Sequence, residues 1–420
     1  MRIHTALILM MSFFVATGDS LADTDSALMK ASQKETAGFV DDLRAIVNID
    51  SGTGYAPGLA QVEAFLVRHL KKLGAQVSTI EAKAKPDVCV ESKPSVGRTV
   101  VGTLHGNGSL NIMLMIHYDT VFEPGEAAKR PFRVEESKAF GPGVADAKGG
   151  ALLILHALDI ARRRGFKEYH TLTVLFNPDE EKSSLGSREI IKDLASRQDV
   201  VLIYEPPKAE EQVTIATNGI AWVHLDVQGA GAHAGLNPEK GRNALVELAH
   251  QITQLKDLGN SSIGTTVNWT FLETDNKERV NKIPGQACAI ADMRLADSNE
   301  IERVQQDATR ISQQKLIPDT QVSVTVESRR TPFKKNPDTD RLASLAAKIF
   351  SELGKKIEPV AMRYSTDASF AFNPVGGKPA VLDGMGIVGD EIHTPGEWAD
   401  LNSIPSRLYL TVRMLEILAK

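Results

Sequence analysis

The sequence predicts an α/β protein with a doubly wound, mostly parallel sheet, interrupted by a smaller ferredoxin-like α+β domain. Short apolar runs alternate with helical spacing up to residue 205, an order typical of doubly wound sheets. From about residue 218, strand-like segments alternate apolar and polar residues, which indicates strands with one exposed face. After residue 331 the buried α/β pattern returns, so the second unit is an insertion in the first.

The first part of the main domain, residues 23–217, contains expected helices and buried strands in alternation. Apolar spacing predicts helices at 37–47, 61–73 and 151–164, and Gly74 ends the second of them. Short apolar runs at 112–116, 172–176 and 200–204 are bounded by polar segments, as buried parallel strands are.

The inserted domain, residues 218–331, has the order strand, helix, strand, strand, helix, strand, which is that of a split βαβ unit. Its expected elements lie at 221–227, 244–255, 267–272, 287–295, 301–313 and 322–327. In the second part of the main domain, residues 332–420, we expect a helix at 341–353, a strand at 380–382 and a last helix at 405–418. Ser403 is the expected N-cap of that last helix.

The first 22 residues have the form of a cleavable secretory signal. Arg2 and His4 precede an apolar stretch at 6–16, and Ser20-Leu21-Ala22 then supplies small residues for cleavage. A membrane anchor is the alternative, but the stretch is short for a bilayer span. We therefore expect cleavage after Ala22 and a periplasmic or secreted protein, in which Cys89 and Cys288 either pair or stay as buried thiols.

The composition is that of a soluble globular protein, with 42% hydrophobic and 24% charged residues. A net charge of −5 without a long basic run gives no sign of a nucleic-acid partner. We expect no membrane contact once the signal is removed.

Each of the three predicted buried strands ends in side chains that bind metals. The first leads into His117 and Asp119, the second into Glu180 and Glu181, and the third into Glu205. Because ligands of open α/β sheets bind outside the carboxyl ends of the strands, these side chains should converge at one edge. Ionised carboxylates crowd together only where a cation compensates their repulsion.

Each motif alone has a simpler interpretation. The His-x-Asp pattern of His117 and Asp119 recurs at His224 and Asp226 in the middle of a predicted strand, where a solvated or interface face explains it better. Asp146, within Gly-Pro-Gly-Val-Ala-Asp-Ala-Lys-Gly-Gly, could cap the following helix. Adjacent glutamates are usually a solvated surface pair, although Glu180-Glu181 follows a buried strand and could divide metal binding and proton transfer between them.

Taken together, these motifs resemble the dinuclear zinc exopeptidases and amide hydrolases, which include glutamate carboxypeptidase, acetylornithine deacetylase, succinyl-diaminopimelate desuccinylase and aminoacylase. The match runs from about residue 41 to 420 and is closest to the secreted bacterial glutamate carboxypeptidases of the folate-cleaving type. It rests on the segments around His117, Asp146, Glu180, Glu205, Ala232-His233-Ala-Gly and His393-Thr-Pro-Gly-Glu.

The resemblance implies a site with two Zn²⁺ ions per subunit. Asp146 would bridge them, His117 and Glu205 would complete one site, and Glu181 and His393 would complete the other. Glu180 would be the general base, and Asp119 would orient His117. Two such ions lie about 3.5–4 Å apart and can share a hydroxide while they polarise a carbonyl.

The resemblance also implies roles for the inserted domain, which would form a homodimer contact. His233 of one subunit would reach the partner's active site and help stabilise the oxyanion, although an exposed histidine in this glycine-rich stretch is the simpler reading. Asn281 and Arg294 would line the substrate region. Arg330 would recognise the substrate carboxylate together with Arg294, since a planar guanidinium suits bidentate carboxylate binding, unless both are surface charges.

The expected function is a zinc metallocarboxypeptidase that releases a C-terminal amino acid from a peptide or an N-acyl amino acid. The alternatives are an N-acyl-amino-acid deacylase with the same site and a metal- or peptide-binding protein without turnover. Arg363 and Tyr364 stand where the glutamate carboxypeptidases have small residues, and Gln212 and Thr214 replace a Lys and a Ser. Metal-dependent amide hydrolysis is therefore a firmer expectation than preference for C-terminal glutamate.

Overall fold

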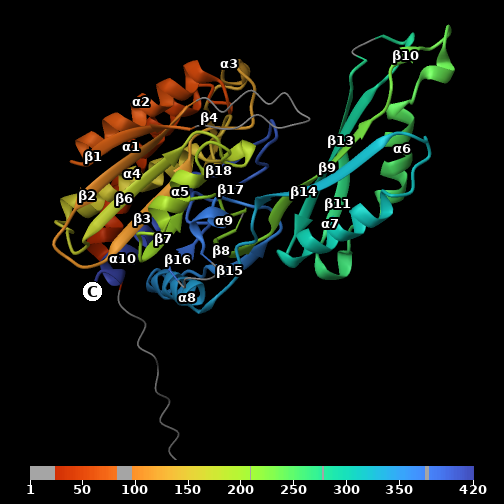
Figure 1. Ribbon diagram of the computed structural model, residues 1–420. Coiled ribbons are helices and arrows are strands. Elements are labelled where there is room, and N and C mark those ends of the chain that lie inside the picture. The colour runs from red at the N-terminus through yellow and green to blue at the C-terminus, as the bar shows by residue number, and fades with distance from the viewer. Residues whose placement is uncertain (1–23, 83–96, 209, 277–278, 374–377) are drawn as a thin grey trace, which may run out of the picture.

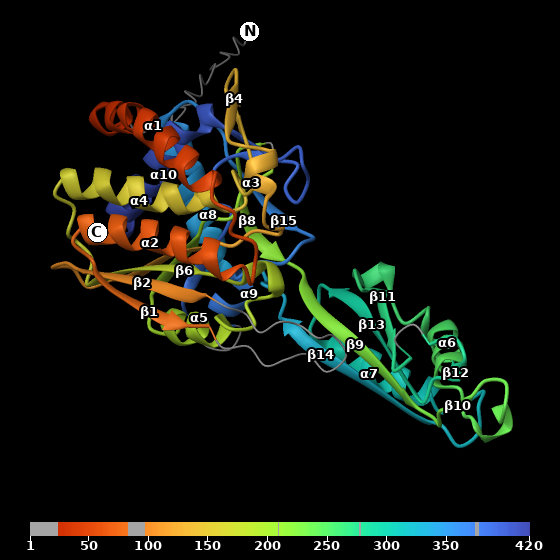
Figure 2. The same cartoon turned by 90° about the horizontal axis from the view of Figure 1, so that it is seen from above.

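The computed structural model describes residues 24–82, 97–208, 210–276, 279–373 and 378–420. Figures 1 and 2 show a main domain, in which helices cover a sheet, and an elongated arm that extends from it. The arm is the inserted domain, and the predicted fold class is confirmed. The expected signal segment lies in residues 1–23, outside the described residues, as does Cys89.

The main sheet has six strands in the order β1 (Gln76–Glu81), β2 (Arg98–His105), β6 (Thr171–Asn177), β3 (Asn111–His117), β7 (Val200–Ile203) and β16 (Ala380–Leu382). The last four are parallel to one another, whereas β2 pairs antiparallel with both β1 and β6. The central position of β3 places the ends of β6, β3 and β7 side by side, with His117 opposite Asn177.

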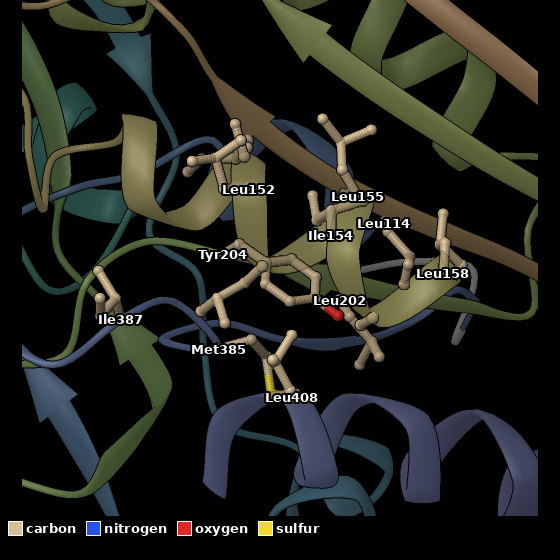
Figure 3. Close-up of a cluster of buried hydrophobic side chains, with 14 of the residues drawn as sticks. Leu114, Leu152, Ile154, Leu155, Leu158, Leu202, Tyr204, Met385, Ile387 and Leu408 are labelled. Carbon is tan, nitrogen blue, oxygen red and sulfur yellow. The ribbon is translucent and has the colours of Figure 1, made fainter. Parts of the chain in front are cut away.

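The strands of this sheet are buried on both faces, which explains their continuous apolar runs. On one face, Leu114 and Leu202 pack with side chains of α4 (Lys148–Arg163) and α10 (Ile404–Leu418), as Figure 3 shows. Helices α1 (Ser26–Val47), α2 (Ala56–Lys72) and α8 (Pro337–Glu352) join the same core. On the other face, Met113 and Met115 pack with α5 (Arg188–Ala195) and α9 (Ala368–Ala371).

The inserted domain is an antiparallel sheet in the order β11 (Thr266–Thr274), β13 (Gln286–Leu295), β9 (Gly219–Gln228) and β14 (Gln321–Arg330). Its apolar face packs against α6 (Ala244–Leu255) and α7 (Asn299–Ile311). This is the predicted ferredoxin-like arrangement. A short pair, β10 (Ala232–His233) and β12 (Lys282–Ile283), lies at the far end of the arm in Figure 1.

Smaller elements surround the edge of the main sheet where β3, β6 and β7 end. One small sheet joins β17 (Gly389–Asp390), β18 (Trp398–Asp400), β5 (Lys138–Phe140) and β4 (Arg133–Glu135), near helix α3 (Glu126–Lys129). Strands β8 (Gln212–Thr217) and β15 (Glu358–Met362) form a parallel pair. The two chain crossings to the arm run together, because Ile220 of β9 pairs with Arg330 of β14 and Thr217 bridges Phe333.

Two local expectations are corrected. Helix α1 begins at Ser26 rather than at 37, because Asp25 caps it by accepting a hydrogen bond from the backbone of Leu28. Ser403 precedes α10 but makes no side-chain cap, because its hydroxyl donates to the carbonyl of Asp400 and accepts from the backbone of Val388. In the described part of the chain, every helix is too short or too polar to cross a membrane.

Candidate active site

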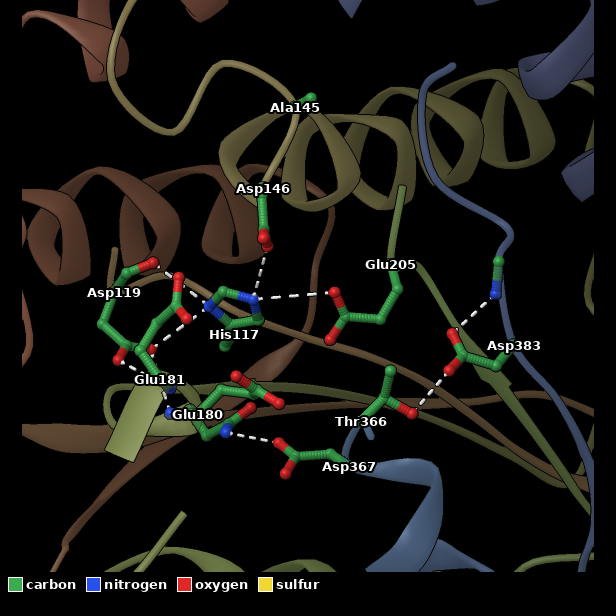
Figure 4. A network of polar contacts seen from close by, with 12 residues as sticks. His117, Asp119, Ala145, Asp146, Glu180, Glu181, Glu205, Thr366, Asp367 and Asp383 are labelled. Carbon is green, nitrogen blue, oxygen red and sulfur yellow. Dashed lines mark hydrogen bonds and ion pairs between the residues drawn. The ribbon is translucent and has the colours of Figure 1, made fainter. Parts of the chain in front are cut away.

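The five predicted metal ligands meet at one point above the sheet edge (Figure 4 labels four of them). They arrive from separate elements. His117 ends β3, Glu181 lies in the turn Glu180–Lys182 after β6, and Glu205 follows β7 by two residues. Asp146 precedes α4, and His393 lies between β17 and β18. The ends of the parallel strands therefore bring their polar side chains together at one edge of the sheet, as the sequence predicts.

Asp146 is at the centre of this group. Its Oδ1 lies 3.0 Å from His117 Nε2, and its Oδ2 lies 3.2 Å from His393 Nε2. Glu205 Oε2 is 3.7 Å from the same nitrogen of His117, while Glu181 Oε2 is 3.3 Å from that of His393. Asp146 thus lies between two pairs of potential ligands. One of its oxygens is near the pair His117 and Glu205, and the other is near the pair His393 and Glu181.

The donor set fits divalent metal ions. Two imidazole nitrogens and three carboxylates are ligands that zinc accepts. Ligand atoms of His117, Asp146 and Glu181 all lie within 4.8 Å of one another. Within the described residues, the buried Glu181 Oε1 has no hydrogen-bond partner, which is costly for a carboxylate unless a cation takes it.

The shifted pKa values of the pocket side chains also favour a bound cation. Burial raises the pKa of Glu181 to about 7, and the nearby carboxylate of Asp146 adds to this rise. Burial also raises the pKa of Glu205. The carboxylates of Asp146 and Glu181 raise the pKa of His393 to about 11, so the pocket strongly favours positive charge. A divalent cation would supply that charge without a proton.

Asp119 connects the ligand His117 to the turn that carries the two glutamates. His117 Nδ1 hydrogen-bonds the backbone carbonyl of Asp119 at 3.1 Å and lies 3.2 Å from its Oδ1, which leaves Nε2 to face Asp146. The same carboxylate accepts hydrogen bonds from the backbones of Glu180 and Glu181, at 3.1 and 3.3 Å, and from the hydroxyl of Thr53, at 2.6 Å. Such partners fix the tautomer and orientation of a ligand histidine.

Glu397 holds the Asp146 loop in a way that the sequence did not reveal. Its carboxylate accepts the backbone N–H groups of Gly143, Ala145 and Asp146 at 2.8, 3.0 and 3.0 Å. It ends the His393-Thr-Pro-Gly-Glu segment, so it stood in a recognised motif, but only the folded chain shows what it binds.

Glu180 borders the pocket beside the ligands. Its side chain is 11% exposed, and its Oε1 lies 2.7 Å from Nη2 of Arg330. Burial raises its pKa well above the usual range, although the charge of Arg330 opposes this rise. The described residues that line the pocket are Asp146, Glu180, Glu181, Glu205, Pro206, Tyr364, Ser365, Thr366, Ile392 and His393.

Four predicted site residues, His233, Asn281, Arg294 and Arg330, lie on the inserted domain, and none of them is among the described residues that line the pocket. His233 is exposed on β10, and its Nδ1 accepts the backbone N–H groups of Gly235 and Leu236, both at 3.1 Å. This arrangement puts the ring hydrogen on Nε2. Asn281 is exposed, and its backbone carbonyl accepts a hydrogen bond from the backbone of Ala234. Arg294 on β13 pairs with Asp292 at 2.7 and 3.1 Å.

The fold and the site together define a metal-dependent hydrolase of peptide or amide bonds. The family model described as peptidase family M20/M25/M40 matches residues 113–417, and the chain belongs to this family. It is 36% identical to carboxypeptidase G2 of Pseudomonas sp. (strain RS-16) over 415 residues, which cover 98% of this chain and 97% of that protein. The predicted enzyme class is confirmed.

Solved structures with lower identity share the fold. The dipeptidase Dug1p of Saccharomyces cerevisiae is 14% identical with a TM-score of 0.73, over 94% of this chain and 98% of that one. The M20 family metallo-carboxypeptidase Sso-CP2 of Sulfolobus solfataricus is 15% identical with a TM-score of 0.70, over 91% and 99%.

Proposed function

We propose that this enzyme hydrolyses the amide bond to a C-terminal amino acid, in a peptide or an N-acyl amino acid, with two Zn²⁺ ions per subunit. The observation that carries the proposal is the position of Asp146, whose two oxygens face His117 and His393 separately. A carboxylate placed in this way suits a bridge between two cations. The similarity to carboxypeptidase G2 supports the choice of a C-terminal bond.

His117, Asp146 and Glu205 would hold one ion, and His393, Asp146 and Glu181 the other. When bound, the ions polarise the scissile carbonyl and make water more acidic. Glu180 borders the same pocket and would accept the proton from the attacking water, then pass it to the leaving amine. Asp119 would keep the ring of His117 in the required orientation.

We also propose that the enzyme is a homodimer in which the inserted domain provides the contact. Strand β11 stands at the edge of its sheet with Phe271 and Leu272 exposed, and α6 exposes Leu245 and Val246. Exposed apolar side chains at a sheet edge mark a pairing surface. His233 of the partner subunit would donate its Nε2 hydrogen to the oxyanion, and Asn281 and Arg294 would contact the substrate.

Export with cleavage after Ala22 completes the proposal. N-terminal sequencing of the protein from the periplasmic or culture fraction tests it, and a mature chain that still carries residues 1–22 would contradict it.

The two catalytic alternatives differ in the side chain and the acyl group of the substrate that they hydrolyse. A panel of folate, dipeptides and acetyl amino acids distinguishes a carboxypeptidase from an N-acyl-amino-acid deacylase. No turnover of any panel member by the metal-loaded protein would favour the binding-protein alternative and contradict the proposed function.

Replacement of the proposed base tests the mechanism. In Glu180→Ala, kcat should fall roughly 10²–10⁴-fold with bound metal unchanged, because proton transfer is lost. Glu189→Ala is the matched control, since Glu189 lies nearby on α5 with a side chain that is 74% exposed. Equal hydrolysis rates for Glu180→Ala and the parent would remove Glu180 from the mechanism.

A further inference from the structure

Arg330 lies behind the proposed base rather than on a substrate-facing surface. It is the last residue of β14, where the inserted domain rejoins the main domain. Its side chain is 2% exposed, and it is not among the described residues that line the pocket. The location differs from that of Arg294, whose side chain is 38% exposed on β13.

The guanidinium of Arg330 holds Glu180 at two points. Its Nη2 lies 2.7 Å from the Oε1 of Glu180 and donates a hydrogen bond of 2.8 Å to the backbone carbonyl of the same residue. One group thus fixes both the main chain and the carboxylate of the proposed base. Charge-assisted contacts of this kind are short and directional.

On its other side, the guanidinium lies against residues of the main domain. Its Nη1 lies 3.5 Å from Oδ1 of Asp367, and its Cζ lies 5.4 Å from the ring centroid of Phe370. Asp367 is itself held by the amide of Asn177, at 2.7 Å, and by the hydroxyl of Ser184. Although Nε and Nη1 donate no hydrogen bond to a described residue, both are buried. Glu180 thus contacts Nη2, Asp367 faces Nη1, and the ring of Phe370 lies beside the guanidinium.

The strand that carries Arg330 is tied to the pocket wall as well. Arg330 pairs with Ile220 of β9, the strand that leads into the inserted domain. The next residue, Thr331, donates a hydrogen bond of 3.1 Å to the carbonyl of Ser369, close to the pocket residues Ser365 and Thr366. The position of the proposed base is therefore linked to the strand pair at the domain junction.

We propose that Arg330 is a positioning residue that fixes Glu180 for proton transfer from the domain junction and does not anchor the substrate carboxylate. The inference rests on the proposed function, because it assigns a role relative to Glu180. A positioning residue acts on the chemical step, so its loss lowers kcat. An anchor acts on binding, so its loss raises KM.

Arg329 offers a matched control on the same strand. It is equally buried, at 3% exposure, and also pairs with a glutamate, since its Nη1 lies 3.0 Å from Oε1 of Glu327. Its guanidinium lies 3.9 Å from the ring centroid of Trp222, on the sheet of the inserted domain. Arg329→Gln therefore removes a buried charge of the same kind from contacts with Glu327 and Trp222.

The experiment compares the parent, Arg330→Gln and Arg329→Gln on one panel substrate, with kcat, KM, bound metal and melting temperature measured for each. In Arg330→Gln, kcat should fall roughly 100-fold or more while KM stays within about threefold, and bound metal should not change. Arg329→Gln should keep the parental kcat. A raised KM at parental kcat in Arg330→Gln, or an equal fall of kcat in both variants, would overturn the proposal.

Arg330→Lys decides the question if Arg330→Gln does not fold. A lysine keeps the charge but has no rigid planar group that directs Nη2 to both oxygens of Glu180 while Nη1 faces Asp367. We therefore expect kcat to fall about tenfold or more at unchanged KM. Parental kcat, or a raised KM, would overturn the proposal. A parent enzyme that hydrolyses nothing in the panel would instead contradict the proposed function, so the two failures are distinguishable.

Discussion

Asp119 shows how single side chains control the site without contact with the reacting atoms. Its carboxylate faces His117 Nδ1 and accepts two backbone N–H groups from the glutamate turn and a hydroxyl from Thr53. An asparagine at this position would replace one carboxylate oxygen, which accepts these hydrogen bonds, with an amide nitrogen, which can only donate. The orientation of His117 and the place of the turn both depend on the charge.

We predict that Asp119→Asn weakens metal binding roughly 10–100-fold, because the negative charge beside the ligand histidine is lost while only its backbone carbonyl partner remains. Chelator competition measures the affinity. Asp226→Asn is the control, since Asp226 belongs to the similar His-x-Asp pair on β9, outside the described residues of the pocket. Parental metal affinity in Asp119→Asn would contradict the role given to Asp119.

The sequence predicts the strand-end residues of the site because strand ends follow from local apolar runs. His117, Glu180, Glu181 and Glu205 belong to this group. His393 was found through the family resemblance, since the loop before β18 carries no local signal. The contacts of Glu397 and Arg330 join segments that lie 251 and 150 residues apart, so no local pattern could reveal them.

At the scale of elements, helices α1 and α4 are joined by an ion cluster. His156 of α4 lies 2.8 Å from Oε1 of Glu35 through Nδ1 and 3.2 Å from Oδ2 of Asp42 through Nε2. Burial opposes protonation, but the two carboxylates outweigh it and raise the pKa of His156. The same contacts, chiefly the hydrogen bonds from His156, lower the pKa of Glu35 and of Asp42.

The stability from this cluster depends on pH in both directions. The raised pKa of His156 gives stability that is complete below its unfolded pKa of about 6.5 and is lost as pH rises through the folded value. The lowered pKa values of Glu35 and Asp42 give stability that is present above about pH 4 and is lost as pH falls. The cluster is therefore strongest from about pH 4.5 to 6.5.

We predict that His156→Gln destabilises the protein by about 2 kcal/mol near pH 6, since charge-assisted contacts are lost at a buried residue. Thermal unfolding of parent and variant at pH 6 and pH 9 measures the difference. It should shrink at pH 9, and a difference that is equal at both pH values would contradict the ionic role.

The type and order of the elements were predictable, because apolar periodicity marks them. The first and last residues of the elements were less predictable. The start of α1 was missed because residues 26–36 are largely polar, and the contacts that fix this turn come from Asp25 and from α10. Strand β14 extends to Arg330, beyond the alternating pattern, because the junction pairs it with β9.

At the scale of the whole molecule, the arm carries β10 (Ala232–His233) at its end away from the main domain (Figure 1). In the proposed dimer, this histidine serves the partner's site. Two inactive variants should then complement each other, since a mixed dimer of Glu180→Ala and His233→Ala contains one site with both residues intact.

We predict that subunit exchange between these two variants restores roughly a quarter of the parental activity, because half of the dimers are mixed and each has one complete site. Light scattering verifies the dimer. No activity in verified mixed dimers, or parental activity in His233→Ala alone, would contradict the shared site.

The central claim is that five side chains hold two divalent cations around Asp146. Elemental analysis of the dialysed protein, parent beside Asp146→Asn, tests it most directly. The account predicts two equivalents of metal per subunit in the parent, loss of both in Asp146→Asn, and activity that disappears with a chelator and returns with zinc. Full activity in a preparation shown to be free of metal, or unchanged metal content in Asp146→Asn, would contradict it.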